Sequence, residues 1–384
     1  MVVIGGGPAG SMAALTAADK GLSVLMVERD EVIGSPVRCA EGVDDTGLRE
    51  FFEPDPVWIS TKITGYSLVA PDGTVVDMNT KGYEGYILER LIFDRMVAEQ
   101  AASSGAAILT ATEAVGLSEY SDGRRTVTLA NDGRTWDVGA KVVVAADGLE
   151  SRVARWAGLK TNTSAHDMET AAQYVLAGVD VNEAVFQLYF TPEFAPGGYA
   201  WMFPKSSSTA NVGLGISGDY SKDKSPIEYL NDFCDSYFPG ASVVGRTVGG
   251  IPCTGGIKKI IADGLVVAGD SAHMANPITG GGIINALIAG KLAGEVAEKA
   301  LGNGSANESA LSDYVHHCDD RFAKMNRRFH KIKEGIFSIP EDRLNALARE
   351  MISIPQAKRT PIRVLRSALM KRPELLLVLA RVVL

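Results

Sequence analysis

A glycine-rich turn close to the first residue constrains the fold of this chain more than any other feature. Residues 5–10 read GGGPAG and follow the short apolar run MVVI. An alanine-rich stretch and a second apolar run, which ends at Glu28, come next. This order predicts strand, turn, helix and strand, the unit that binds a dinucleotide. Gly5 allows the tight turn, Gly7 lets backbone approach a pyrophosphate, and Gly10 lets the helix pack on the strand.

The acid at the end of the second strand narrows the type of nucleotide. Glu28 lies 18 residues after Gly10, where a carboxylate can accept hydrogen bonds from both ribose hydroxyls. That arrangement favours an adenosine without a 2′-phosphate. The pyrophosphate is expected at the helix N-terminus, where backbone N–H groups face an anion.

The loop after this strand, RCAEG (38–42), has two interpretations. It is either a solvated loop with an incidental thiol, or it places Arg38 near the diphosphate and the backbone of Cys39 to Gly42 against the cofactor. A single thiol here can also serve as a redox group or as a proton donor.

Two later strand ends carry carboxylates. KVVVAA (141–146) is followed by Asp147-Gly148, which can also be a strand-to-helix turn capped by Asp147. GLVVAG (264–269) is followed by Asp270. PITGGG (277–282) then opens a long helix. A carboxylate can accept hydrogen bonds from a polyol, and a helix N-terminus can hold an electron-rich ring edge. Asp270 and the start of this helix therefore suit a flavin.

Composition excludes several classes of protein. The net charge is −8, which argues against a general nucleic-acid binder, and the 46% hydrophobic content argues against disorder. The four cysteines are scattered without metal-ligand spacing, so we expect no metal and a reduced, cytoplasmic protein. No apolar run reaches the length of a membrane span, and no signal peptide is expected.

The pattern of apolar residues predicts an α/β (α+β) fold. A discontinuous Rossmann-like dinucleotide domain is expected at 1–60, 85–165 and 255–300, with helices at 87–103 and from about 278 to 301. A substrate domain with an antiparallel β-sheet is expected at 61–84 and 166–254, including a hairpin at 66–78. Residues 301–384 are expected to form a helical C-terminal region.

One strand of the substrate domain is rich in aromatic residues. Tyr199, Trp201 and Phe203 alternate in YAWMFP (199–204), so their side chains share one face. They form either ordinary core packing or an aromatic wall along a tunnel for a long apolar chain.

These motifs resemble a known family. GGGPAG with Glu28, the Asp147-Gly148 turn and Gly269-Asp270 look like the FAD-binding set of the p-hydroxybenzoate-hydroxylase-like flavoproteins. More narrowly, the chain resembles the archaeal geranylgeranyl reductases, which saturate the isoprenoid chains of membrane lipids. The segments that carry this narrower resemblance are GSPVRCAEG (34–42), YILER (86–90), PGGYAWMFP (196–204), ANVGLG (210–215) and NPITGGGIINA (276–286).

The resemblance implies FAD as the cofactor and assigns further residues to it. Cys39, Ala40 and Gly42 would line the cofactor, although Ala40 stands where the family often has glycine. Arg90 would bond to the flavin, Ala114 would offer its backbone to the adenine, and Asp270 would take a ribityl hydroxyl. Gly282 and Ile283 would face the isoalloxazine ring.

The implied reaction is reduction of C=C double bonds in geranylgeranyl chains on glycerol ether lipids. Cys39 and Tyr199 are the candidate proton donors, with Glu41 a weaker one, and Tyr199, Trp201 and Phe203 would bind the lipid. The reductant would be ferredoxin, a reduced flavin or NAD(P)H. Two alternatives stay open: an FAD-dependent monooxygenase or halogenase, and a non-catalytic flavoprotein in electron transfer.

The charge is distributed unevenly along the chain. Residues 321–384 carry 15 Lys and Arg against 5 Asp and Glu, whereas the rest of the chain is acidic. The segment 360–384 mixes basic and apolar residues at helical spacing. It predicts either peripheral contact with an anionic membrane, on the inner face of the cell membrane, or basic helices packed on an acidic body.

Overall fold

The computed structural model describes residues 1–79 and 82–369. The chain forms two compact units, each assembled from three segments. The first unit comprises Met1–Val37, Arg90–Thr163 and Pro252–Arg327. The second comprises Arg38–Glu89, Ser164–Ile251 and the residues from Arg328 onward.

The first unit is built on a six-stranded sheet with the order β18-β19-β12-β1-β2-β8. All neighbouring strands run parallel except the β18–β19 pair. The central strands are short and completely buried, as expected for a parallel sheet covered on both faces. The strands are β1 (Val2–Ile4), β2 (Leu25–Val27), β8 (Ala107–Leu109), β12 (Val143–Ala145), β18 (Ile261–Ala262) and β19 (Leu265–Val267).

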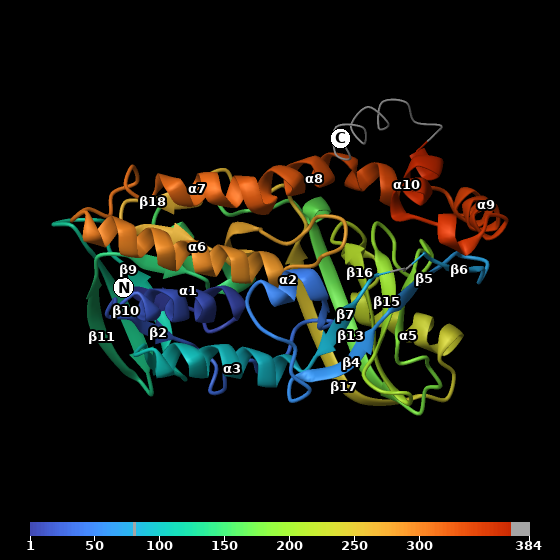
Figure 1. Cartoon of the computed structure of the whole chain (residues 1–384), viewed down its shortest axis with the longest axis horizontal. Helices are drawn as coiled ribbons and strands as arrows, with labels where there is room; N and C mark the ends of the chain where they lie inside the picture. The colour runs from blue at the N-terminus through green and yellow to red at the C-terminus, as the bar shows by residue number, and fades with distance from the viewer. Residues whose placement is uncertain (80–81, 370–384) are drawn as a thin grey trace. The chain divides into compact units, whose positions relative to one another are not determined.

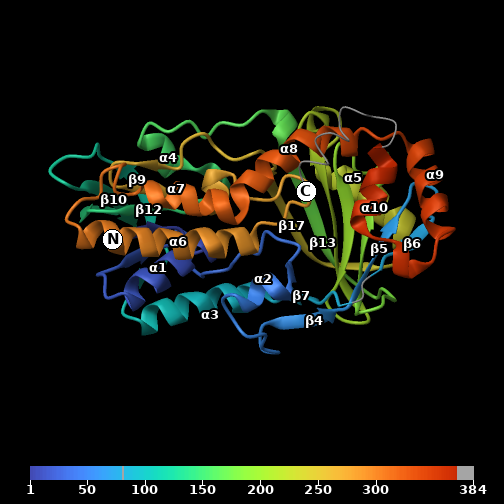
Figure 2. The ribbon, with the colours of Figure 1, turned by 45° about the horizontal axis from the view of Figure 1, so that its top comes forward.

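Helices α1 (Pro8–Asp19) and α6 (Ile283–Gly302) run side by side in this unit (Figures 1 and 2). Their backbones come so close that a Cβ added to Gly290 would lie 2.2 Å from the Ala9 carbonyl oxygen. The predicted order of strand, turn, helix and strand is therefore confirmed, and small residues in both helices make the close packing possible.

Further elements complete the first unit. Tyr314 of α7 donates from its buried hydroxyl to the Val267 carbonyl at 2.9 Å, which ties this helix to the sheet. The remaining elements are α3 (Arg90–Ser103), α4 (Arg152–Trp156), α7 (Ser312–Cys318) and a three-stranded antiparallel sheet of β9 (Glu113–Leu117), β10 (Arg125–Asn131) and β11 (Arg134–Ala140).

The second unit is built on a seven-stranded sheet with the order β17-β13-β16-β15-β14-β5-β6. One face packs on α5 (Pro226–Tyr237), whose start is fixed by a capping box between Ser225 and Glu228. The strands are β5 (Gly65–Val69), β6 (Val75–Asp77), β13 (Met168–Ala177), β14 (Val185–Tyr189), β15 (Tyr199–Pro204), β16 (Thr209–Ser217) and β17 (Ser242–Pro252). The hairpin predicted at 66–78 is confirmed as β5 and β6.

A three-stranded sheet and the C-terminal helices belong to the second unit. The small sheet contains β3 (Gly42–Asp44), β7 (Gly85–Leu88) and β4 (Ile59–Ile63), and α2 (Asp45–Arg49) follows β3. The helices are α8 (Lys324–Phe337), most of which lies in this unit, α9 (Glu341–Ile352) and α10 (Pro361–Leu369). Within residues 1–79 and 82–369, no helix has both the length and the apolar character to cross a membrane.

The observed division differs from the predicted boundaries, most of all at residues 38–60 and in the predicted C-terminal region. Residues 38–60 belong to the second unit, because β3 and β4 both pair with β7. Residues 301–327 belong to the first unit rather than to a separate C-terminal region. The helix predicted over 87–103 begins only at Arg90, since the preceding residues form β7. Residues 370–384 of the predicted C-terminal region lie outside the described residues.

Candidate active site

The glycine-rich turn of the first unit is built for close approach of backbone. Gly5 has a φ of +103°, and a Cβ there would lie 2.1 Å from the Ala146 carbonyl oxygen. A Cβ on Gly10 would lie 1.9 Å from the Gly5 carbonyl oxygen. Both positions therefore require glycine for the fold itself.

Gly7 differs from its two neighbours in the motif. It caps the N-terminus of α1 without a side-chain hydrogen bond, and no atom lies within 4 Å of where its Cβ would be. The protein thus leaves open space beside Gly7 at a helix N-terminus, where the first N–H groups have no partner within the helix. An anionic pyrophosphate fits that space and its partial positive charge.

Glu28 faces the same turn. Its Oε2 accepts from the Gly6 N–H at 2.6 Å and its Oε1 accepts from the Asp30 N–H at 3.0 Å. Each carboxylate oxygen keeps further acceptor capacity, so the residue fits the predicted contact with ribose hydroxyls.

The predicted adenine contact, Ala114, lies on β9, an edge strand of the three-stranded sheet in the same unit. Arg29, Asp30 and Glu113 help to line a cavity of about 390 Å³ on this unit. The backbone contact of Ala114 with adenine stays a prediction.

Asp270 and the start of α6 meet at the end of β19. A Cβ on Gly282, the residue that caps α6, would lie 3.6 Å from Asp270 Oδ1. Burial raises the pKa of the Asp270 carboxyl, while the Arg90 guanidinium lowers it. The guanidinium is held by Asp94, through hydrogen bonds of 2.7 and 2.6 Å. The Asp270 carboxyl therefore lies beside the N-terminus of α6, which begins at Gly282-Ile283. A carboxyl group in this position suits a flavin with its ribityl chain, so the residues of this unit fit FAD.

The RCAEG loop lies in the second unit, where Arg38 is exposed and Cys39 is partly exposed. The Cys39 Sγ accepts from the Glu41 N–H at 3.2 Å. Gly42 has no side chain where Phe203 packs, since a Cβ there would lie 3.0 Å from the Phe203 ring. The predicted contacts of Arg38, Cys39, Ala40 and Gly42 with the cofactor stay predictions.

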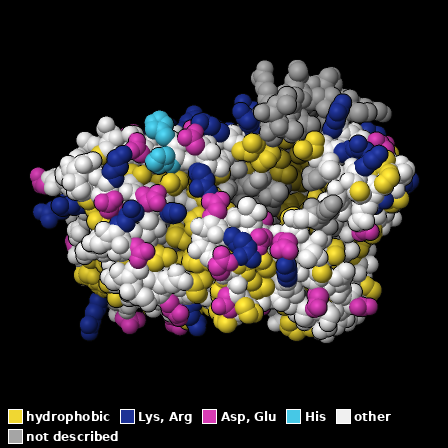
Figure 3. All heavy atoms as spheres, viewed as in Figure 1, with side chains coloured by type: hydrophobic (Ala, Val, Ile, Leu, Met, Phe, Trp, Pro, Cys, Tyr) yellow, Lys and Arg dark blue, Asp and Glu magenta, His cyan; other side chains and the backbone are white. Residues whose placement is uncertain are grey.

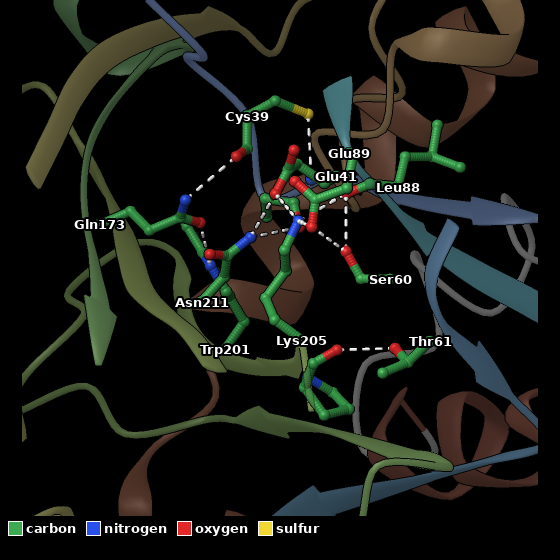
Figure 4. A network of polar contacts seen from close by, with 12 residues as sticks. Cys39, Glu41, Ser60, Thr61, Leu88, Glu89, Gln173, Trp201, Lys205 and Asn211 are labelled. Atoms are coloured by element: carbon green, nitrogen blue, oxygen red, sulfur yellow. Dashed lines mark hydrogen bonds and ion pairs between the residues drawn. The ribbon is translucent and has the colours of Figure 1, made fainter. Parts of the chain in front are cut away.

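Glu41 is the centre of a buried polar network that sequence reasoning missed (Figure 4). Glu41 is 5% exposed, and its carboxylate accepts from Lys205 Nζ at 2.7 Å and from Asn211 Nδ2 at 2.8 Å. Lys205 also donates to the Leu88 carbonyl at 2.7 Å. A carboxylate with these partners is a structural anchor, which makes Glu41 a poor proton donor.

A second connection joins the loop to the aromatic strand. The buried Gln173 on β13 donates from Nε2 to the Cys39 carbonyl at 3.0 Å. Its Oε1 accepts from the Trp201 Nε1–H at 3.0 Å. The sequence signal for Gln173, Lys205 and Asn211 was weak: each is a polar residue in or beside a strand otherwise rich in apolar residues.

The aromatic strand is confirmed. Tyr199, Trp201 and Phe203 lie on β15 with ring centroids 6.0 and 6.5 Å apart, on the same face of the sheet. The row continues beyond the predicted residues, because Phe186 lies 5.2 Å from Phe203 and stacks on Tyr66 at 5.3 Å. At the other end, Tyr199 stacks on Phe337 of α8 at 6.4 Å. We call Tyr66, Phe186, Phe203, Trp201 and Tyr199 the aromatic row.

Histidine residues form no metal centre in the described part of the chain. No group of three His, Cys, Asp or Glu side chains there is arranged to hold a metal ion. Figure 3 shows histidines on the surface over α7, the helix that carries the exposed His316 and His317. His330 lies instead against Asp167, with 2.8 Å between Nε2 and Oδ1.

Comparisons with known proteins agree with these features. Residues 1–49 match the FAD binding domain, and residues 167–251 match the geranylgeranyl reductase catalytic domain. The digeranylgeranylglycerophospholipid reductase of Methanocella arvoryzae is 40% identical over 98% of this chain and 97% of its own length. The enzyme of that name from Methanosphaerula palustris is 42% identical over 98% of this chain and 96% of its own length.

Solved structures of other proteins also resemble this chain over nearly its whole length. A geranylgeranyl bacteriochlorophyll reductase-like protein from Thermoplasma acidophilum has a TM-score of 0.91 and 32% identity, covering 99% of this chain and 98% of its own. A p-nitrophenol 4-monooxygenase from Pseudomonas putida has a TM-score of 0.73 at 17% identity, covering 97% of each chain. The latter likeness shows a common fold alone.

The fold, the dinucleotide turn and the family matches define a flavoprotein: an FAD-dependent oxidoreductase that acts on carbon–carbon double bonds. Within that class, the chain belongs to the digeranylgeranylglycerophospholipid reductase family.

Proposed function

We propose that this protein saturates the C=C double bonds of geranylgeranyl chains on archaeal-type glycerol ether phospholipids, with FAD as its cofactor. The observation that carries the substrate class is the aromatic row. Its rings extend over neighbouring strands β5, β14 and β15, and most of them are only partly buried. A row of aromatic faces suits a long unsaturated hydrocarbon chain.

Residues of the first unit hold the cofactor in this proposal. The turn at Gly5 to Gly10 would take the pyrophosphate, Glu28 the ribose, and Asp270 with the start of α6 the flavin end. When it is bound and reduced, FAD supplies the hydride for the double bond.

The second hydrogen must reach the neighbouring carbon as a proton, and we assign Cys39 as its donor. The Glu41 N–H is directed at Cys39 Sγ, so it stabilises the thiolate that remains after the S–H bond breaks. Tyr199 is the second candidate. Its ring packs between Trp201 and Phe337, which favours a role in binding the lipid.

Mass spectrometry of the lipid tests the reaction. Protein reduced by dithionite is incubated with digeranylgeranylglycerophospholipid in the absence of oxygen. We expect mass increases of two hydrogens for each double bond, and a large loss of rate in Cys39→Ser with FAD still bound. Oxygen insertion in air, or FAD-bound protein that leaves the lipid unchanged, would contradict the proposal in favour of a monooxygenase or an electron carrier.

The reaction needs a reductant, and the same assay distinguishes the three candidates. Reduced ferredoxin, a reduced flavin or NAD(P)H replaces dithionite in turn. The donor is the one that supports repeated turnover at a rate that saturates with its concentration.

We further propose that the C-terminal helices contact an anionic membrane. On α10, Ile362 is 54% exposed beside the exposed Arg363 and Arg366, a combination typical of helices at a bilayer surface. Arg363→Glu/Arg366→Glu should reduce binding to phosphatidylglycerol vesicles but not to phosphatidylcholine vesicles. Lys20→Glu/Arg134→Glu makes the same charge change on exposed residues of the first unit and serves as the control. Equal binding by both variants would contradict this contact.

A further inference from the structure

One buried amide connects the thiol loop with the aromatic row. Gln173 is 7% exposed, and both ends of its amide are used: Nε2 donates to the Cys39 carbonyl, and Oε1 accepts from the indole N–H of Trp201, each at 3.0 Å (Figure 4). Because one partner is an acceptor and the other a donor, the pair also fixes which way the amide points.

The loop is anchored on its other side by charge. The Glu41 carboxylate is held by Lys205 and Asn211, and Asn211 also donates to the Ala40 carbonyl at 3.4 Å. The three consecutive residues from Cys39 to Glu41 therefore each accept a hydrogen bond from the strands of the large sheet or from the residue that follows β15. The thiol sits on a loop with little freedom to move relative to that sheet.

Trp201 is also held tightly. Its ring lies over Gly213 of β16, where a Cβ would come within 2.5 Å of the indole. A side chain at position 213 would push the indole away from Gln173. The contact of indole with amide thus depends on the glycine opposite it, as well as on the two polar groups.

We propose that Gln173 is a positioning residue for the reduction, which fixes the Cys39 loop relative to Trp201 and so sets the proton donor against the lipid chain. This inference rests on the proposed function, in which Cys39 is the donor and the aromatic row binds the lipid. A prenyl chain offers no polar group along its length, so the wall that it lies on must provide the alignment. Cys39 would give its S–H proton to one alkene carbon as a C–H bond forms there, bound reduced FAD would supply the hydride for the other carbon, and solvent would return a proton to the thiolate.

The first test is Gln173→Leu, which is similar in size and makes neither hydrogen bond. We expect kcat to fall roughly ten- to a hundredfold, because misplacement of reacting groups by about 1 Å has effects of this size. KM should change by less than about threefold, since the aromatic surface remains. FAD absorbance should stay close to that of the wild type, whereas Tm should fall, because the Cys39 carbonyl and the Trp201 N–H each lose their partner.

The matched control is Gln187→Leu. Gln187 lies on β14 of the same sheet and accepts a hydrogen bond from the Tyr189 hydroxyl at 2.7 Å, within the side of the sheet that packs on α5. It contacts neither Cys39 nor Trp201 through a described hydrogen bond. Its kcat should match that of the wild type, which separates positioning from a general loss of sheet packing.

The second test reads the thiol directly and needs neither FAD reduction nor lipid. The rate at which iodoacetamide alkylates Cys39 is measured against pH and assigned by peptide mapping. Cys253 and Cys318 are buried, and burial raises the pKa of the Cys234 thiol to about 12, so these should react slowly near neutral pH. In Gln173→Leu we expect the midpoint of the Cys39 profile to move to higher pH, because a looser loop weakens the N–H···S hydrogen bond. Gln187→Leu should leave it unchanged.

Trp201→Phe removes the hydrogen bond between the indole and Gln173 but keeps an aromatic ring at position 201. If the three groups act together, Gln173→Leu/Trp201→Phe should be at most about twofold slower than Gln173→Leu alone. Should Gln173→Leu fail to fold, Trp201→Phe carries the same expectation for the alkylation profile. Wild-type kcat and alkylation profile in these variants, or effects on kcat that multiply, would overturn the positioning role. Failure of the wild type to reduce lipid would instead overturn the proposed function.

Discussion

The first unit forms its proposed cofactor site, and the second its proposed lipid site, in different ways. In the first unit the important groups are backbone N–H groups and missing side chains: Gly5 and Gly10 fit where a Cβ would collide, and Gly7 leaves open space. In the second unit the important groups are buried side chains that reach across strands, with Glu41 and Gln173 as their centres.

This difference has an energetic consequence. A backbone site needs only the correct local conformation, and α1 with the strands beside it provides that conformation. A buried ion pair depends on both partners, because either charge alone would be desolvated without compensation. Substitutions in the second unit should therefore act through the partner left behind, and those in the first through steric collision.

Lys205→Met should have the largest effect on stability. It leaves the Glu41 carboxylate buried with Asn211 but without a cation, and we expect a loss of about 3 kcal/mol in the free energy of unfolding. Urea unfolding followed by circular dichroism measures it. Lys205→Met/Glu41→Gln removes the uncompensated charge and should recover part of the loss.

The control for this prediction is an exposed ion pair. Lys299 pairs with Asp313 at 2.6 Å, with side chains 63% and 41% exposed, so Lys299→Met should leave the unfolding midpoint unchanged. If Lys205→Met behaved like Lys299→Met, the second unit would not depend on its buried charges.

Gly10→Ala and Gly7→Ala form a pair that tests the first unit. The Cβ of Gly10→Ala would meet the Gly5 carbonyl, and we expect a loss of roughly 2 kcal/mol in stability. Gly7→Ala meets no atom within 4 Å and should leave the Tm of FAD-free protein unchanged. Its FAD affinity should nevertheless fall, because the methyl group occupies the space proposed for the pyrophosphate. Equal Tm values for the two variants, or normal FAD affinity in Gly7→Ala, would contradict this account of the turn.

The same difference explains how far sequence could predict the site. The dinucleotide turn was predictable because strand, glycines and Glu28 occur within 28 residues, and local spacing carries the geometry. The alternation of Tyr199, Trp201 and Phe203 was predictable for the same reason. Gln173 and Lys205 were missed, because their partners at positions 39 and 41 lie more than 130 residues away. Only the register of β13, β15 and β16 brings them together.

The domain boundaries were affected by the same limit. Residues 38–60 directly follow the first nucleotide-binding segment in the sequence, so the sequence pattern assigned them to the same domain. Their pairing partner is β7, which comes more than twenty residues after β4. Here residues that are neighbours in the sequence belong to different sheets. Hydrophobic periodicity detects local patterns along the sequence but not which strands pair.

Asp167→Asn should have the smallest effect and a distinct dependence on pH. Burial raises the pKa of Asp167, but the hydrogen bond and charge of His330 lower it, and the net result is a pKa below the ordinary 3.8. A carboxyl with a lowered pKa contributes stability above its unfolded pKa and loses it as pH falls through the folded value. We therefore expect Asp167→Asn to lose about 1 kcal/mol at neutral pH, and this difference to disappear as the pH falls through the lowered pKa of Asp167. The control is Asp219→Asn, whose partner His166 lies 3.1 Å away with both side chains at least half exposed, and which should change stability less. A difference between Asp167→Asn and wild type that stayed constant in acid would show that packing rather than charge holds α8 at this place.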